Sequence, residues 1–215
     1  MTDPITIWTY DWVPNGPRGF VRDMRLRWAL EEAGLPYRIA TVPITDRGPE
    51  HLARQPFAQV PFIDDGGVCL FESGACLLHI AEKTDSLMPP GAQDRADVLQ
   101  WLFAALNSVE LVTVPWWFIS LSKPETNPLA DWMGKRLDLL EAAMAGREWV
   151  AAGRFTIADI ALADVLRVKA IREALDTRPA LRAYVDRACD RPAFRKALDD
   201  QMAHFAKADA DRDAG

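Results

Sequence analysis

The sequence is poor in the residues that most often carry redox or metal chemistry. Its 215 residues include three cysteines and three histidines. The cysteines, Cys69, Cys76 and Cys189, form no CxxC pair and leave an odd count, which argues against a disulfide framework. We therefore expect buried, reduced thiols and no metal site.

Long hydrophobic runs and an excess of positive charge are also missing. No apolar run approaches the ~20 residues that span a bilayer, and the N-terminus "MTDPITIWTYDW" lacks the basic and then apolar layout of a secretory signal. The 25 Lys and Arg against 31 Asp and Glu give a net charge of -6, which argues against nucleic acid as a partner. We therefore expect a cytoplasmic protein without a membrane or nucleic-acid partner. The eight tryptophans indicate aromatic-lined cavities or contacts.

The first half of the chain alternates strand and helix patterns. Residues 5–10, "ITIWTY", are β-branched and aromatic, which is typical of a strand. Apolar side chains then recur at helical spacing over residues 21–33, until Gly34 supplies a left-handed C-terminal position. The following patterns predict a strand, a short helix, a hairpin about "DDGG" and a further helix: residues 37–42, 48–56, 59–71 and 73–83. The order βαβ, α, ββα predicts a first domain over residues 1–84, followed by the linker "TDSLMPPGAQ".

The second half contains only helical patterns. Four amphipathic stretches predict the helices of a bundle, with a break at Pro192: residues 94–114, 128–146, 156–175 and 178–205. The "TIAD" sequence is a capping-box variant, in which Thr156 and Asp159 have a structural role. We expect an all-helical domain over residues 93–207. The closing residues 208–215 have almost nothing to bury and are expected to be disordered.

The most specific pattern is the run "RQPFAQVPFIDDGGVCLFESGACLLHIAEK". It resembles the glutathione-binding half of the glutathione S-transferase family, in which Asn-Pro-x-Gly-Gln-Val-Pro precedes a hairpin and Glu-Ser begins the next helix. The matching residues are Gln55-Pro56, Gln59-Val60-Pro61, Asp65-Gly66 and Glu72-Ser73. Two further segments, "RLRWALEEAGLPY" and "GRFTIADIALADV", extend the resemblance over most of the chain. One departure is Ala58, where the family commonly has glycine. The resemblance implies an α/β plus all-α fold, with a thioredoxin-like N-terminal domain, an all-helical C-terminal domain and a homodimer.

The residues of this run have the chemistry to bind a tripeptide. Ser73 offers a hydroxyl and backbone N–H groups at a helix start, where a carboxylate is favoured, and Glu72 can receive the ammonium group of the same γ-glutamyl unit. The alternative is that Ser73 only caps the helix. The resemblance implies that the Val60–Pro61 bond is cis and that Val60 binds the cysteinyl part of glutathione, with Gln59 in support; the alternative is an edge-strand proline that blocks pairing. Two residues could meet the glycine carboxylate or simply lie on the surface: Arg47 and His51.

The loop after the first strand, "WTYDWVPNGPRGFVRD", contains no serine, cysteine or histidine. Family members that activate glutathione usually place a hydroxyl or thiol there, and counting back from the first helix finds neither near residues 20–22. Arg18 could hold a thiolate by its charge, and Asn15 resembles the asparagine of a Thr-Pro-Asn-Gly motif in some bacterial members, although Val13 replaces the threonine. Tyr10 could imitate the tyrosine type or merely pack in its strand. Backbone N–H groups of residues 19–21 are a further alternative.

Tryptophans are the candidates for a second-substrate pocket. Trp12 lies in the opening loop, and Trp116 and Trp117, followed by Phe118, come near the end of a long helix that faces the glutathione site in the family. An aromatic cluster suits an apolar electrophile. The alternative is a core or dimer contact.

These patterns predict a glutathione transferase-like enzyme. It would bind glutathione as a co-substrate, stabilise its thiolate and conjugate it to a small apolar electrophile. One alternative is a non-catalytic glutathione- or protein-binding module of the same fold. Another is a glutathione-dependent disulfide reductase, in which glutathione provides the sulfurs because the opening loop has no cysteine.

Overall fold

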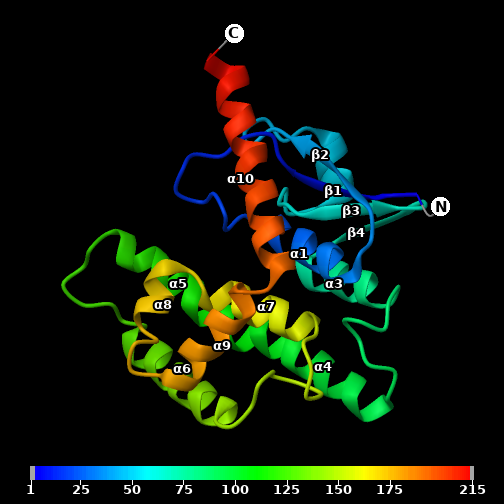
Figure 1. Ribbon diagram of the computed structural model, residues 1–215. Helices are drawn as coiled ribbons and strands as arrows, with labels where there is room; N and C mark the ends of the chain where they lie inside the picture. The colour runs from blue at the N-terminus through cyan, green and yellow to red at the C-terminus, as the bar shows by residue number, and fades with distance from the viewer. Residues whose placement is uncertain (1–2, 214–215) are drawn as a thin grey trace. The chain divides into compact units, whose positions relative to one another are not determined.

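The computed structural model describes residues 3–213, which fall into two compact units (Figure 1). Unit 1 joins the residues up to Ser86 with those from Pro192 onward, and unit 2 takes Leu87–Arg191. Unit 1 contains β1 (Ile5–Tyr10), α1 (Asp23–Ala33), β2 (Tyr37–Val42), α2 (Pro49–Arg54), β3 (Phe62–Asp65), β4 (Val68–Phe71), α3 (Ser73–Ala81) and α10 (Pro192–Asp213). Unit 2 contains α4 (Ala92–Ala104), the π-helical turn η1 (Ala105–Glu110), α5 (Leu111–Leu121), α6 (Ala130–Met144), α7 (Ile157–Leu166), α8 (Lys169–Glu173) and α9 (Pro179–Cys189).

Unit 1 is built on a mixed four-stranded sheet of order β2-β1-β3-β4. β1 is parallel to β2, and β3 is antiparallel to both β1 and β4. Alternate side chains of these strands face opposite sides. Ile7 and Ile63 are fully buried, and on the other face Trp8 stacks on Phe62 at 5.4 Å between ring centroids, beside His51 of α2. The βαβ and ββα units predicted from the sequence are confirmed.

The first helix ends as the sequence predicts but starts later. α1 begins at Asp23, two residues after the expected start, and Gly34 closes it with a left-handed φ of 63°. Asp23 is fully buried, and it accepts hydrogen bonds from Arg27 Nε at 2.8 Å and from Gln201 Nε2 of α10 at 2.7 Å. Burial raises the pKa of the Asp23 carboxyl. The donors from two helices compensate its removal from water.

The last helix packs in unit 1, which differs from the domain boundaries expected from the sequence. Phe194 contacts Trp28 of α1 at 4.8 Å between ring centroids, and Phe205 is fully buried in the same unit. The helix continues to Asp213, so the expected disorder is wrong for residues 208–213, while residues 214 and 215 lie outside the described part of the chain. Apolar residues of α10 therefore complete the core of unit 1.

Unit 2 is all-helical, as predicted, but two of its helices differ from expectation. Residues 92–121 form one long helical segment that is interrupted by the π-helical turn η1. Pro115, which follows within α5, has no backbone N–H to donate to the helix. The predicted helix over residues 156–175 divides into α7 and α8 at Val168, whose φ of −55° and ψ of 128° are not helical. The capping box of Thr156 and Asp159 at the start of α7 is confirmed.

The segment Ala92–Leu121 is long and apolar enough to cross a membrane, by length and composition only. Core helices of globular proteins meet the same criteria. This segment buries Val98, Leu102, Val109 and Val112 within unit 2. Among the described residues it is the one helix of this kind.

Candidate functional site

Three strand ends meet at one edge of the unit 1 sheet. The register pairs Trp8 of β1 with Phe62 of β3, and Phe62 with Phe71 of β4. Because both pairings are antiparallel, the end of β1, the start of β3 and the end of β4 lie at the same edge. This arrangement brings together the segments that carry the residues predicted to bind glutathione: Gln59, Val60, Pro61, Glu72 and Ser73. The opening loop starts at the same edge, directly after Tyr10.

The segment before β3 is held in place by neighbouring side chains. Gln55 Oε1 accepts a hydrogen bond from the Phe57 N–H at 2.6 Å, and His51 Nε2 donates to the Gln59 carbonyl at 2.8 Å. Arg47 Nη1 donates to the Ala58 carbonyl at 2.6 Å. His51 is 5% exposed, so it supports this segment from inside rather than meeting a glycine carboxylate. The backbone that carries the predicted glutathione contacts Gln59 and Val60 is therefore held in place by these side chains.

Val60 precedes a cis peptide bond to Pro61, as the resemblance implies. Among residues 3–213, no backbone hydrogen bond engages Val60, which lies just outside β3. Its N–H and C=O can therefore pair with an extended peptide. Gln59, by contrast, is exposed, and its carbonyl is already used by His51.

Glu72 and Ser73 form the turn into α3. Glu72 occupies the N-cap position with φ 71° and ψ 119°, a conformation that residues other than glycine rarely adopt. Ser73 is the first helical residue, so it does not occupy the N-cap position that the alternative interpretation gave it. The Ser73 side chain is buried, and its Oγ accepts a hydrogen bond from Arg25 Nη1 at 3.1 Å. Glu72 remains exposed beside it.

Arg25 contacts the candidate residue Ser73 and is not among the residues expected from the sequence. It is 2% exposed in α1, and its guanidinium lies under the start of α3. A buried positive charge at a helix N-terminus, where the dipole is also positive, favours an anion. The only sequence signal is a charged residue among the apolar positions of α1, which by itself does not identify a partner.

The opening loop places its candidate activating groups differently. Tyr10 is half-buried, its ring lies 5.3 Å from the Arg47 guanidinium, and its carbonyl accepts a hydrogen bond from His204 Nε2 at 3.0 Å. Its ring packs against the core of unit 1, and its catalytic role stays a prediction. Asn15 is exposed, and its carbonyl accepts a turn hydrogen bond from the Arg18 N–H at 3.3 Å, which leaves its side-chain amide at the surface. Of the backbone alternatives, the Phe20 N–H is already bonded to the Pro17 carbonyl.

Arg18 forms an ion pair with α10. Its Nη1 and Nη2 donate to the two carboxylate oxygens of Asp209 at 2.5 and 2.7 Å, and Nε and Nη2 donate to the Val13 carbonyl at 3.1 and 2.9 Å. Hydrogen bonds from Arg18 and Trp12 lower the pKa of Asp209 to about 2. Because its charge is neutralised by this carboxylate, Arg18 is a poor group for holding a thiolate.

The tryptophans of the predicted second-substrate pocket lie in different units. Trp12 belongs to unit 1, and its Nε1 donates to Asp209 Oδ1 at 2.7 Å. Trp116 and Trp117 lie in α5 of unit 2, where both are half-buried. Phe118 packs edge-on against Trp117 at 5.1 Å and is 62% exposed. The pocket itself stays a prediction.

The cysteines are unsuited to nucleophilic chemistry. All three are free thiols, and burial raises the pKa of Cys76 to about 12 and that of Cys189 to about 11. The pKa of the more exposed Cys69 is also raised, by partial burial and by Asp64. Within residues 3–213, no group of three His, Cys, Asp or Glu side chains is arranged to hold a metal ion.

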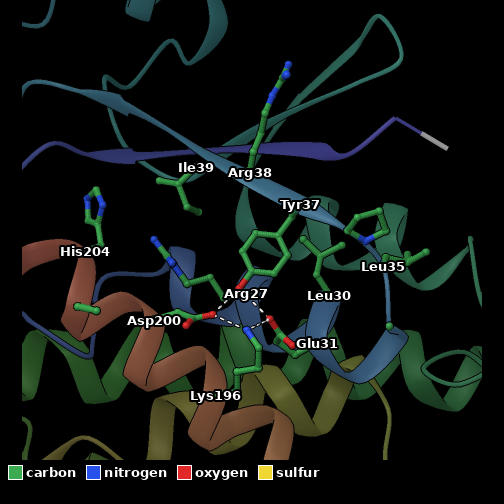
Figure 2. A pocket seen from close by; sticks show the side chains of 13 residues that line it. Arg27, Leu30, Glu31, Leu35, Tyr37, Arg38, Ile39, Lys196, Asp200 and His204 are labelled. Atoms are coloured by element: carbon green, nitrogen blue, oxygen red, sulfur yellow. Dashed lines mark hydrogen bonds and ion pairs between the residues drawn. The ribbon is translucent and has the colours of Figure 1, made fainter. Parts of the chain in front are cut away.

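A separate pocket of about 710 Å³ lies between α1, β2 and α10 (Figure 2). On its wall, Lys196 Nζ lies 2.8 Å from Glu31 and 2.7 Å from Asp200, and the Tyr37 hydroxyl bridges the same two carboxylates at 3.0 and 3.2 Å. None of the residues predicted to bind glutathione lines this pocket. Its polar cluster is a second set of contacts that joins α10 to α1.

Comparisons with known proteins agree with this arrangement. The family model "Glutathione S-transferase, N-terminal domain" matches residues 16–82, and the corresponding C-terminal domain model matches residues 117–192. The chain is 32% identical to the disulfide-bond oxidoreductase YfcG of Escherichia coli (strain K12), over 79% of this chain and 86% of that protein. It is 30% identical to glutathione S-transferase 3 of Zea mays, over 81% and 87% of the two chains.

A solved structure is also similar to this chain. A glutathione transferase family member from Pseudomonas fluorescens Pf-5, with two glutathione bound, has a TM-score of 0.77 and 25% identity, and the match covers 90% of this chain and 92% of that one. Two domain models, two relatives and the observed sheet agree on one assignment. The chain belongs to the glutathione S-transferase family.

Proposed function

We propose that this protein binds glutathione at the sheet edge and conjugates its thiol to a small apolar electrophile. The main support is the convergence of Val60, Glu72 and Ser73 at one edge, with the buried guanidinium of Arg25 under Ser73. The solved relative with two glutathione bound supports the same ligand. In this proposal glutathione is a co-substrate, and no metal takes part.

Each part of the tripeptide has a matching group in the proposal. The γ-glutamyl carboxylate binds the Ser73 hydroxyl and the N-terminus of α3, and its ammonium group binds Glu72. The cysteinyl backbone pairs with the N–H and C=O of Val60, and Gln59 supports the γ-glutamyl end. These contacts leave the sulfur directed toward the opening loop, which begins at the same edge.

The sulfur must be held as a thiolate, and Asn15 is the residue we propose for this role. Its exposed amide can donate a hydrogen bond to the anion, which lowers the thiol pKa. The thiolate then attacks the electrophilic carbon with its electron pair. A carbon–sulfur bond forms, and the leaving group departs with the electrons of the broken bond. Trp12, in the opening loop of unit 1, remains a proposed contact for the apolar substrate.

A second candidate function is glutathione-dependent disulfide reduction. The 32% identity to a disulfide-bond oxidoreductase favours it. The raised thiol pKa values of Cys76 and Cys189 argue against attack by the protein's own sulfurs. One glutathione thiolate would therefore attack the substrate disulfide and release one thiolate. A second glutathione would attack the mixed disulfide, giving oxidised glutathione and the other reduced thiol.

Calorimetric titration with reduced glutathione tests the binding site. We expect Ser73→Ala to weaken binding by about 10- to 100-fold, because a charge-assisted hydrogen bond is lost. Ser122→Ala, at an exposed serine in unit 2, is the matched control and should bind normally. No binding by the unaltered protein, or normal binding by Ser73→Ala, would overturn the proposed site.

Turnover assays separate the candidate reactions. Chlorodinitrobenzene reports conjugation, and hydroxyethyl disulfide reports reduction. We expect Asn15→Ala to lower kcat about tenfold or more while Asn107→Ala, at an exposed asparagine in η1, leaves it unchanged. Glutathione binding without turnover in either assay would instead favour a non-catalytic binding module.

Sedimentation of the purified protein tests the proposed homodimer, and fractionation of cells tests the proposed cytoplasmic location.

A further inference from the structure

The C-terminal helix contacts the opening loop along its whole length. At the loop's start, His204 Nε2 donates to the Tyr10 carbonyl at 3.0 Å. At its end, Gln201 Nε2 donates to the Val21 carbonyl at 3.1 Å. Between them, Gly19 has a φ of 80°, and a Cβ atom there would lie only 3.2 Å from Leu198 Cδ1 of α10. The loop backbone therefore rests directly on α10.

The strongest contacts come from the last turns of α10. The Asp209 carboxylate accepts hydrogen bonds from both terminal nitrogens of Arg18 and from the indole N–H of Trp12, at 2.5–2.7 Å. Arg18 also donates twice to the Val13 carbonyl, so the ion pair fixes the loop backbone two residues before Asn15. The Arg212 guanidinium lies 4.4 Å from the Trp12 ring centroid. We name Trp12, Val13, Arg18 and Asp209 the C-terminal clamp.

We propose that the C-terminal clamp positions the opening loop for thiolate stabilisation, with Asp209 as the positioning residue. This inference rests on the proposed function, because it concerns the sulfur of bound glutathione. The clamp closes the turn that contains Asn15: Arg18 N–H donates to the Asn15 carbonyl from inside that turn, while its guanidinium is held by α10. A bidentate arginine–carboxylate pair restricts direction as well as distance. Asp209 touches no substrate and acts through Arg18 and Trp12.

The clamp and the proposed γ-glutamyl contacts use different residues. Ser73 is held by Arg25 of α1, whereas α10 contacts the loop through His204, Gln201 and Asp209. Loss of the clamp should therefore change the thiol more than the binding of the rest of glutathione. Because the pKa of Asp209 is lowered to about 2, the carboxylate stays ionised over the whole range in which a bound thiol titrates. A change in the thiol titration then reports loop position.

The test compares Asp209→Asn with Asp211→Asn. Asp211 pairs with Lys207 on an exposed stretch of the same helix, at 2.5 Å, and serves as the matched control. The thiol pKa of bound glutathione is followed by the ultraviolet absorbance of its thiolate. Affinity for S-methylglutathione, which has no ionisable thiol, reports the remaining contacts. We expect Asp209→Asn to raise the bound thiol pKa by about one unit and to change S-methylglutathione affinity by less than about twofold.

Further variants separate positioning from a general loss of structure. Arg18→Met should raise the thiol pKa as Asp209→Asn does, and the double variant should add little, because both remove the same contact. Asp209→Glu, which keeps the carboxylate, should recover part of the effect. An unchanged thiol pKa in Asp209→Asn overturns the positioning role alone, as does a loss of S-methylglutathione affinity as large as the thiol effect. Failure of the unaltered protein to bind glutathione overturns the proposed function as well.

Discussion

At the residue scale, Ala58 holds a backbone conformation that suits glycine. Its φ is 53°, and it lies in the segment that Arg47 and His51 fix in front of β3. A left-handed conformation costs a residue with a Cβ about 1–2 kcal/mol, part of which glycine loses again through its greater freedom in the unfolded chain. We expect Ala58→Gly to raise the free energy of unfolding by about 0.5–1 kcal/mol. Urea denaturation measures this change.

A second alanine gives the opposite expectation. Ala53 is exposed inside α2, where glycine is about 1 kcal/mol less favourable than alanine. Ala53→Gly should therefore lower stability. If both substitutions lower stability by the same amount, the strain assigned to position 58 is absent.

Residue identities indicate the local part of the proposed site but not its distant part. Val60, Glu72 and Ser73 stand out because short, fixed spacings join them to turn and helix signals. Arg25 and Asp209 were missed because their partners, Ser73 and Arg18, lie 48 and 191 positions away in the sequence. No periodicity or composition connects positions so far apart. Arg18 is a candidate thiolate partner by its charge, and its counter-ion Asp209 is visible only in the structure.

At the scale of single elements, the start of α7 depends on Asp159. Its carboxylate accepts the N–H of Val150 at 2.9 Å, the N–H of Thr156 at 2.9 Å and the hydroxyl of Tyr184 at 3.1 Å. Asp159→Ala leaves these buried donors without partners, and we expect it to lower the free energy of unfolding by about 3–5 kcal/mol. Thermal denaturation followed by circular dichroism measures the loss. Asp199→Ala, at an exposed position of α10, should change stability by less than about 0.5 kcal/mol.

The same element shows why sequence patterns locate helices better than their interruptions. The "TIAD" box specifies a helix start through contacts three residues apart, and that prediction is confirmed. The break between α7 and α8 coincides with Arg167, which pairs with Asp164 at 2.6 Å in a buried position. The helical spacing of apolar residues continues through Val168, although the helical backbone does not. The sequence pattern therefore predicts one helix where the structure has two.

At the scale of the whole molecule, the assignment of α10 was the main difference from the sequence prediction. Helical periodicity shows that residues 192–205 have an apolar face, but it does not show what covers that face. In the structure, α10 contacts Trp28, Asp23 and Gly19 of unit 1, all of which precede it by more than 160 positions. The thioredoxin-like sheet was predictable from local strand and turn signals. The helix that completes its unit was not.

Two truncations distinguish the roles of α10. A chain that ends at Arg191 loses the buried residues Phe194, Ala197 and Phe205, and each large apolar side chain contributes about 1.5–3 kcal/mol by burial. Loss of Asp23's partner Gln201 adds to this, against a total stability of typically about 5–15 kcal/mol. We expect unit 1 of this chain to lose its fixed tertiary packing, measured by near-ultraviolet circular dichroism.

A chain that ends at Lys207 keeps Gln201, His204 and Phe205 and removes the clamp residue Asp209. Its thermal midpoint should stay close to that of the full protein, because residues 208–212 are exposed or half-buried and bury little apolar surface. Its bound glutathione should nevertheless show the raised thiol pKa expected for Asp209→Asn. Equal thermal midpoints for the two truncated chains would contradict the placement of α10 in unit 1. A shortened chain with full stability and a normal thiol pKa would show that the last turn of α10 has no part in positioning the loop.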